Sequence, residues 1–462
     1  MFKNFFLEIL LFFILESFIS TNKKFKKKKS ESTPKNKIEE EIPFLYKWAK
    51  KNNIYIDNKL KLNKNTDSFH NFYYFTSNQY IPNNTILLRV PYDSMISQSS
   101  LEKYFKEKRS KKFAYLWDRI LEIENRYISY FSTKQYLYMA IIIEDAINKK
   151  KGPIYNKYKP YFDMYEYINM DNFPVFYDDE EIHYLTPSSF GSELEQAIES
   201  LKEEYYIINN DLKITTSMED TFLKYRVLAL ANSVTFNNTK ISEKYDANDS
   251  VIVPFIDCFK KAIVSINISA IYTFKQDKNN NYYLEIKTIQ EIPKNEEIYL
   301  KWQRMPNNDL LIYYGFIEKG NYLAPKYYVD VFNNLFKNDL GVDTKKTFSD
   351  VIKRGRFELG TEFFETDVVR SYKNLSKLFD HYKNRPEGFY EMMADNLNYY
   401  LQMYQGQFSD GNINLYIKGE NKRKYIKIIM KLEQRLIQNK MNYVKTVIKD
   451  IKDGVANPPE DL

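Results

Sequence analysis

Cysteine, histidine and glycine are scarce in this chain. Its 462 residues include one cysteine, Cys258, three histidines and 12 glycines. A single cysteine excludes a framework of intrachain disulfides, and the wide spacing of His70, His183 and His381 gives no zinc-binding pattern. No glycine precedes Gly152, so the first part of the chain lacks the residue that most readily adopts positive φ. We therefore predict neither a structural disulfide nor a metal site.

Long apolar runs are also missing. Residues 9–15 (ILLFFIL) are too few to cross a bilayer, which takes ~20 apolar residues. They fit the hydrophobic region of a secretory signal with cleavage near Ser20, and the alternative is a buried N-terminal helix of a cytosolic protein. A basic stretch follows, free of acids until Glu31. We predict a signal peptide over residues 1–20, a basic linker or transit-like segment over residues 21–42, and no transmembrane segment after signal removal.

The charge excess is small for the length of the chain. A formal net charge of +7 over 462 residues is a weak field, and only residues 23–29 form a dense basic cluster. Nucleic-acid binding is therefore not predicted. With 44% hydrophobic and 17% aromatic residues the chain can bury apolar surface, and its length leaves room for two cores.

The folded part divides by its residue pattern into a β-rich unit, a helical insert and a helical end. Strand-like aromatic and β-branched residues occupy residues 72–90 around the turn signal IPNN, and again residues 250–298. Helical periodicity is expected in residues 43–52, 116–147, 218–230, 379–403 and 422–451. This order predicts an α+β protein with a split β-rich domain, followed by an all-helical domain.

Four short segments carry a resemblance to a known family. They are YIPNNTILLRVP at residues 80–91, VPFIDCF at 253–259, EIPKNEEIYLKW at 291–302 and NNDLLIYYGFIEKGN at 307–321. Their order and spacing resemble the Rubisco large-subunit methyltransferase class of SET proteins. The resemblance implies a SET domain over residues 43–321 with a helical insert at about 102–230, and a helical substrate-binding domain over residues 322–462.

The same resemblance implies an S-adenosylmethionine-dependent protein-lysine methyltransferase. In that family the methyl donor lies on a Gly-containing bend, an Asn-His pair and an Arg hold its polar ends, and tyrosines line the pore where the methyl group is transferred. Chemistry of this kind depends on holding donor and amine collinear, and ring faces favour the cationic sulfonium.

Nearly every one of these positions is substituted here. No glycine stands in the stretch HNFYYF around Phe72, where the bend is expected, and Val234 replaces the Arg. The Asn-His pair aligns with Lys260 and Lys261, so two ammonium groups are expected to face a donor that itself carries a sulfonium and an ammonium. A like-charge pair ~4 Å apart costs roughly 4 kcal/mol at an effective dielectric of 20. Trp302 stands at the catalytic Tyr position.

Two family residues remain, Tyr314 at a catalytic pore position and Phe316 at a position of the S-adenosylmethionine site. Tyr314 is either the remaining pore tyrosine or a core residue supporting the chain crossing, and Asp257 is expected to be structural. We predict a catalytically degenerate SET protein, a pseudoenzyme that binds a protein or peptide through the SET groove and the helical domain. The alternative is an active protein-lysine or protein-histidine methyltransferase with a remodelled donor site, for which S-adenosylmethionine is the cofactor.

The residue composition also bears on origin. The excess of Lys, Asn, Ile and Tyr is typical of very AT-rich genomes such as those of apicomplexan parasites. In such an organism, a signal peptide followed by a basic segment resembles a bipartite address to the relict plastid, the apicoplast. Entry into the secretory pathway is therefore expected, with the apicoplast or the endoplasmic reticulum and vacuolar space as destinations.

Overall fold

The computed structural model covers the whole chain, and its described residues are 41–64, 73–97, 157–161, 163, 170–212, 219–237, 248–264, 267–279, 281–321, 328–329, 357–358 and 386–454. The expected signal peptide, the basic segment, Phe72 and the expected helix at 116–147 lie outside these ranges. The first described helix, α3 (Glu41–Lys51), matches the helical pattern expected at residues 43–52.

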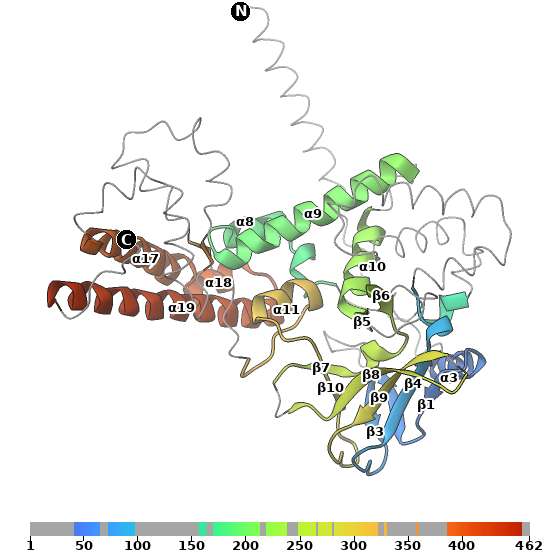
Figure 1. Ribbon diagram of the computed structural model, residues 1–462. Helices are drawn as coiled ribbons and strands as arrows, with labels where there is room; N and C mark the ends of the chain where they lie inside the picture. Colours follow the sequence, from blue (N-terminus) through green and yellow to red (C-terminus); the bar gives the residue numbers. More distant parts are fainter. Residues whose placement is uncertain are drawn as a thin grey trace, which may run out of the picture. The chain divides into compact units, whose positions relative to one another are not determined.

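A six-stranded sheet forms the centre of the β-rich part, in the order β1-β4-β9-β8-β10-β7. These strands are β1 (Tyr55–Ile56), β4 (Ile86–Pro91), β7 (Lys260–Ala262), β8 (Ala270–Gln276), β9 (Tyr282–Thr288) and β10 (Tyr299–Lys301). Strands β4, β9 and β8 pair antiparallel, whereas β10 runs parallel to both β8 and β7. The sheet therefore brings the early segment beside the late one, as a split SET domain requires (Figure 1).

Smaller strand pairs complete the β-rich part. They are β2 (Leu60–Lys64) with β3 (Tyr73–Ser77), and β5 (Ser233–Asn237) with β6 (Asn248–Ile252). The two expected turns are present, because Asn84 and Asn295 adopt left-handed backbone conformations with φ of 70° and 68°. Asparagine tolerates this conformation better than other non-glycine residues.

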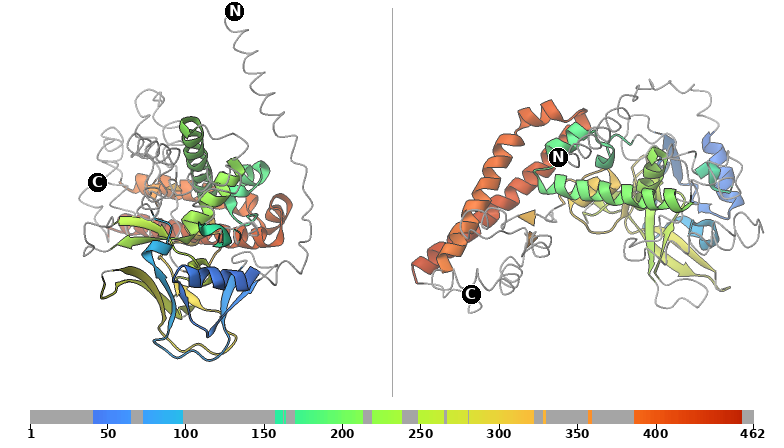
Figure 2. Two further views of the ribbon diagram at one scale, coloured as in Figure 1. Left: turned by 90° about the vertical axis from the view of Figure 1, so that its right-hand side faces the viewer. Right: turned by 90° about the horizontal axis from the view of Figure 1, so that it is seen from above.

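Helices of the insert precede β5. They are α8 (Asp179–Leu185), α9 (Ser189–Leu212) and α10 (Glu219–Asn232). A capping box starts α8, in which the Asp178 side chain accepts from the Glu181 N–H and Glu181 accepts in return. Helices α9 and α10 run in different directions (Figure 2). The short helix α11 (Asn307–Tyr314) follows β10 and ends at Gly315, whose φ of 72° is readily adopted only by glycine.

The C-terminal part is mainly helical. Its helices are α17 (Pro386–Gln407), α18 (Asp410–Tyr416) and α19 (Glu420–Lys452), and α17 and α19 run side by side (Figure 1). The region was expected to be all-helical, but it also contains the two-stranded pair β11 (Tyr328–Val329) and β12 (Phe357–Glu358). Aromatic and β-branched residues favour short strands there.

Among the described residues, the C-terminal helices share one hydrophobic core with other parts of the chain. One hydrophobic cluster contains residues of α8, α9 and α11 together with residues of α17, α18 and α19. Leu311 and Ile312 of α11, for example, are buried in the same cluster as Ile429 and Ile437 of α19. The end of the SET segment is therefore packed into the helical part, and the domain boundary near residue 321 remains a sequence prediction.

Candidate functional site

The two lysines of strand β7 point to opposite faces of the sheet. Lys260 Nζ lies 2.6 Å from Glu297 Oε2 and 5.0 Å from the centre of the Tyr299 ring, where its side chain is 45% exposed. Lys261 Nζ instead lies over the rings of Trp302 and Tyr314. Successive strand residues face opposite sides of a sheet. The expectation that both ammonium groups face one ligand is therefore wrong, and only Lys261 enters the site.

Lys261 lies in a small aromatic pocket. Its Nζ is 4.9 Å from the centre of the Trp302 ring, 5.5 Å from that of Tyr314 and 2.9 Å from the side-chain oxygen of Asn232. Burial lowers the pKa of Lys261 to about 8, and Asp257 acts in the opposite direction. Ring faces and an amide oxygen both favour a cation, but burial outweighs them, so Lys261 holds its ammonium group here at an electrostatic cost.

Further aromatic side chains extend the pocket. The Trp302 ring meets Tyr314 edge-on at 6.1 Å and Tyr272 at 6.1 Å, and Phe316 meets Tyr314 edge-on at 6.5 Å. Trp302 is buried, and its indole N–H has no hydrogen-bond partner of standard geometry. Burial raises the pKa of Tyr314 above its ordinary value, which keeps the hydroxyl protonated. Trp302, Tyr314 and Phe316 are thus brought together, as the sequence alignment predicts.

The other aligned positions lie apart from this pocket or are structural. Val234 is buried in β5 and pairs across the strand with Val251 of β6. Asp257 follows the left-handed Phe255, whose φ is 69°, and accepts a hydrogen bond of 3.3 Å from the Tyr161 hydroxyl. The thiol of Cys258 is buried, which raises its pKa and leaves it protonated. None of these groups is placed to act as an acid, base or nucleophile.

The motif at residues 307–321 forms a network of hydrogen bonds near Lys261, which we call the knot. The Asn307 side chain accepts from the Glu318 N–H at 3.0 Å and donates to the Glu318 carbonyl at 3.2 Å. Asn321 donates to the Met305 carbonyl at 2.9 Å. The Glu318 carboxylate in turn accepts from the backbone N–H groups of Ile263 and Val264 at 2.6 and 3.1 Å. The motif therefore fixes the chain just after Lys261.

A buried carboxylate joins this motif to the C-terminal helices. Glu433 of α19 accepts from the Asn308 amide at 3.0 Å, from the Phe190 N–H at 2.9 Å and from the Tyr404 hydroxyl. It is fully buried, and burial raises its pKa to about 7, against the lowering effect of these three hydrogen bonds. One side chain thus links helices α9, α11, α17 and α19.

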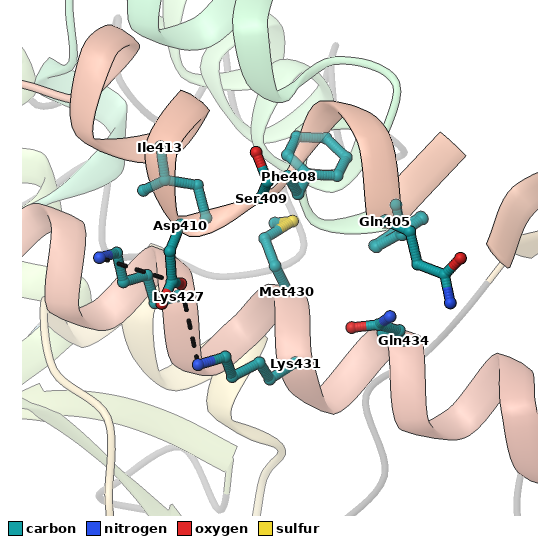
Figure 3. A pocket seen from close by; sticks show the side chains of 10 residues that line it. Gln405, Phe408, Ser409, Asp410, Ile413, Lys427, Met430, Lys431 and Gln434 are labelled. Atoms are coloured by element: carbon teal, nitrogen blue, oxygen red, sulfur yellow. Dashed lines mark ion pairs between the residues drawn. The ribbon is translucent and has the colours of Figure 1, made fainter. Parts of the chain in front are cut away.

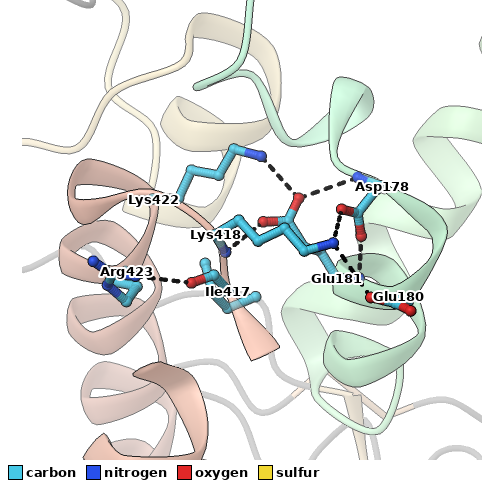
Figure 4. Close-up of polar contacts among 7 residues, drawn as sticks. All are labelled: Asp178, Glu180, Glu181, Ile417, Lys418, Lys422 and Arg423. Atoms are coloured by element: carbon cyan, nitrogen blue, oxygen red, sulfur yellow. Dashed lines mark hydrogen bonds and ion pairs between the residues drawn. The ribbon is translucent and has the colours of Figure 1, made fainter. Parts of the chain in front are cut away.

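A second carboxylate links α8 to the start of α19 (Figure 4). Glu181 is buried and accepts from the Lys418 N–H and from Lys422 Nζ, both at 2.8 Å. The Lys418 ammonium lies 2.7 Å from Asp178 and 3.3 Å from Glu180, at the surface. These contacts lock the insert against the C-terminal helices rather than form a reactive site.

One hollow among the C-terminal helices has a volume of about 240 Å³ (Figure 3). Phe408, Ile413 and Met430 line it, and Asp410 faces Lys427 Nζ and Lys431 Nζ at 3.9 and 3.8 Å. These distances are long for ion pairs, and the Ser409 hydroxyl, which also lines the hollow, caps α18 by accepting from the Asn412 N–H. The hollow therefore carries no chemistry of its own.

Within the described ranges no three His, Cys, Asp or Glu side chains gather as metal ligands. Across the same residues, no helix combines the length and the apolar character that a membrane crossing needs. Sequence reasoning missed Asn232, Glu318 and Tyr272. For Glu318 the signal was present in the motif GFIEKGN, because a carboxylate in the irregular stretch between Gly315 and Gly320 can accept backbone N–H groups.

Solved structures share this fold. The chain superposes on the SET domain of LSMT bound to lysine and AdoHcy with a TM-score of 0.61 and 13% identity, covering 91% of this chain and 94% of the other. It superposes on Rubisco LSMT bound to AdoMet with a TM-score of 0.56 and 13% identity, covering 92% and 93%. The fold is therefore that of a SET-domain lysine methyltransferase, as the segment order predicts.

Sequence comparison gives one distant relative and no family model matches the chain. "Ribosomal lysine N-methyltransferase 4" of Saccharomyces cerevisiae is 21% identical over 308 residues, which is 60% of this chain and 56% of that protein. The chain thus spans just over half the length of the curated relative that it matches.

Proposed function

We propose that this chain is a SET-fold protein that binds a protein or peptide partner and has lost methyl transfer. One observation carries the proposal: Lys261 Nζ lies over the rings of Trp302 and Tyr314, at 4.9 and 5.5 Å. Tyr314 and Trp302 align with the family's methyl-transfer pore, where a neutral target amine must meet a sulfonium. An ammonium group of the chain itself already fills that place.

Electrostatics opposes a bound donor here. S-adenosylmethionine carries a sulfonium and an ammonium, and the Lys261 ammonium repels both. Val234, at the aligned Arg position, offers no charge to the donor carboxylate. Each lost charge-assisted hydrogen bond removes ~1.5–3 kcal/mol. Two or three such losses weaken a micromolar site by roughly three decades, at ~1.4 kcal/mol per decade.

Calorimetric titration of the purified chain with S-adenosylmethionine tests the proposal. We expect a dissociation constant in the millimolar range or weaker, and no methyl transfer to any protein. The three changes Val234→Arg, Lys261→His and Trp302→Tyr are expected to restore binding when made together, and none of them is expected to do so alone. Lys260 is left unchanged because it faces away from the site. Micromolar binding by the unmodified chain contradicts the proposal.

Exposed apolar side chains on the helical part support partner binding. Leu415 is 72% exposed and Tyr416 46% exposed, and with Tyr184 and His183 they line an open hollow between α8 and α18. Exposed apolar clusters of this kind often mark protein contacts. A partner found by proximity labelling is expected to be lost with Leu415→Asp and kept with Lys445→Ala, a change at an exposed site of α19. Equal labelling of the partner by both variants contradicts this surface.

The second candidate is an active protein-lysine methyltransferase with a remodelled donor site. The edge-on pair Tyr314 and Phe316 favours it, because one residue at an aligned pore position and one at an aligned donor-site position are kept. By analogy with the yeast relative, ribosomal proteins are the first substrates to test. Transfer of labelled methyl groups to purified ribosomal proteins, abolished by Tyr314→Ala and kept with Lys260→Ala, would move this candidate to first place.

The origin and address of the chain are also proposals. We propose an apicomplexan source, cleavage near residue 20 and delivery through the secretory pathway to the apicoplast or to the endoplasmic reticulum and vacuolar space. The apolar residues 9–15 and the basic residues 23–29 support them. A fluorescent C-terminal fusion is expected to leave the cytosol and to lose its first residues. Cytosolic fluorescence with an intact Met1 contradicts the address.

A further inference from the structure

The aromatic pocket of Lys261 has the features of a site for an alkylammonium ion. Trp302 and Tyr314 present ring faces to one point, and Asn232 adds an amide oxygen 2.9 Å from Lys261 Nζ. Tyr272 and Phe316 pack behind these rings. Aromatic cages of this composition bind quaternary and methylated ammonium groups.

The pairing of strand β7 with β10 sets the position of Lys261. Leu300 of β10 pairs with Lys261 of β7, which sets Lys261 two residues from Trp302 in the neighbouring strand. Glu318 then holds the backbone of Ile263 and Val264. The position of the lysine is thus set by the sheet and the knot together, and does not depend on an exposed ion pair.

We infer that Lys261 is an internal ligand, which occupies in cis a pocket that otherwise binds an alkylammonium ion from solution. The inference rests on the proposed function only in taking this pocket as the one where the family aligns its target amine. Removing the side chain empties the pocket, whereas replacing it with an uncharged chain of similar length leaves it filled.

Fluorine NMR of the chain labelled with fluorotryptophan gives a direct readout. The chain has three tryptophans, and the Trp302 signal is identified by its absence in Trp302→Phe. Tetramethylammonium is the probe. We expect Lys261→Ala to show a saturable shift of the Trp302 signal, with an affinity at least about tenfold above wild type, because a cation–π contact of ~1.4 kcal/mol corresponds to tenfold.

Two variants serve as matched controls. Lys261→Met keeps the pocket filled and is expected to respond as weakly as wild type. Lys260→Ala removes the neighbouring lysine on the opposite face of β7, and is also expected to behave as wild type. A Lys261→Ala chain that does not respond, or a wild-type chain that responds as strongly, overturns the inference.

A second measurement applies if Lys261→Ala does not fold, which the other two tryptophan signals reveal. The wild-type Trp302 signal is expected to move with pH around the lowered pKa of Lys261, about 8, and that of Lys261→Met to stay in place. The facing groups are Asp257 and the hydroxyls of Tyr272 and Tyr314, and burial raises the pKa of both tyrosines above 10. A signal unmoved from roughly pH 6.5 to 9.5, or moved equally in both chains, overturns the inference.

This experiment separates the inference from the proposed function. Donor titration of the wild-type chain decides whether S-adenosylmethionine binds. The response of Trp302 to tetramethylammonium decides whether Lys261 fills the cation site, whatever the outcome for the donor.

Discussion

Two groups of polar residues lie near the end of β7, and they differ in how many of their polar atoms have hydrogen-bond partners. On one side, Asn307, Glu318 and Asn321 exchange hydrogen bonds with backbone groups. On the other, Lys261 faces two rings and one amide, beside a tryptophan N–H without a partner of standard geometry. The side that agrees with the family motif holds the fold together, whereas the other side combines the substituted residues Lys261 and Trp302 with the retained Tyr314.

Removing Glu433 is expected to have the largest effect, since it extends the satisfied side into the helices. Glu433→Leu leaves the Asn308 amide and the Phe190 N–H without an acceptor. At ~1–3 kcal/mol for each of the two buried donors left unpaired, we expect a loss of roughly 2–6 kcal/mol, measured by urea unfolding. Unfolding at the wild-type urea concentration would show that the buried network contributes little.

The stability that Glu433 contributes is expected to depend on pH. Burial raises the Glu433 pKa from 4.5 to about 7, so the folded state holds the proton more tightly than the unfolded state. Its contribution to stability is full below about pH 4.5 and is lost as pH rises to about 7. Stability of wild type relative to Glu433→Gln is therefore expected to fall over that window. A constant difference would show that Glu433 titrates normally.

Asn307→Ala comes next in size. It removes both hydrogen bonds to the Glu318 backbone, and we expect a loss of about 1–3 kcal/mol by thermal or urea unfolding. Gln303→Ala, a change at an exposed position nearby, is the matched control and is expected to be neutral. Equal effects of the two changes would contradict a special role for the knot.

Replacing Lys261 is expected to raise the stability of the fold, in contrast to the changes at Glu433 and Asn307. Burial lowers the pKa of Lys261 to about 8, so charging it in the folded state opposes folding at neutral pH. Lys261→Met is expected to raise stability at pH 7 by about 1–2 kcal/mol, after allowance for partial exposure. The gain should fade as pH rises from about 8 towards 10.5, the ordinary pKa. Lys260→Met, which breaks an exposed pair with Glu297, should change stability by less than about 1 kcal/mol.

Local patterns were enough to predict much of the fold. The turn signals IPNN and PKNEE predicted tight connections, and the structure places left-handed asparagines in both, at Asn84 and Asn295. The amphipathic stretches near the C-terminus became α17 and α19. The pairing of β10 with both β7 and β8 could not be predicted, because parallel neighbours far apart in sequence leave no local periodicity.

The site was predicted less well than the fold. The rings of Trp302, Tyr314 and Phe316 lie together in the structure, although they come from the two separate segments 291–302 and 307–321. The alignment treated Lys260 and Lys261 as one pair, although alternation along a strand separates their faces. Asn232 was missed, since a single Asn at a helix end in an Asn-rich chain carries no signal until the sheet places it against Lys261.

The position of Glu433 has a consequence for the order of folding. Its partners Asn308 and Phe190 precede it by 125 and 243 residues. Their polar groups therefore lack this acceptor until α19 has been synthesised. Contacts so distant in sequence form slowly, and an incomplete chain exposes apolar surface meanwhile. The helical half is therefore expected to fold after the main sheet, and nascent chains ending before α19 should be the ones that require chaperones.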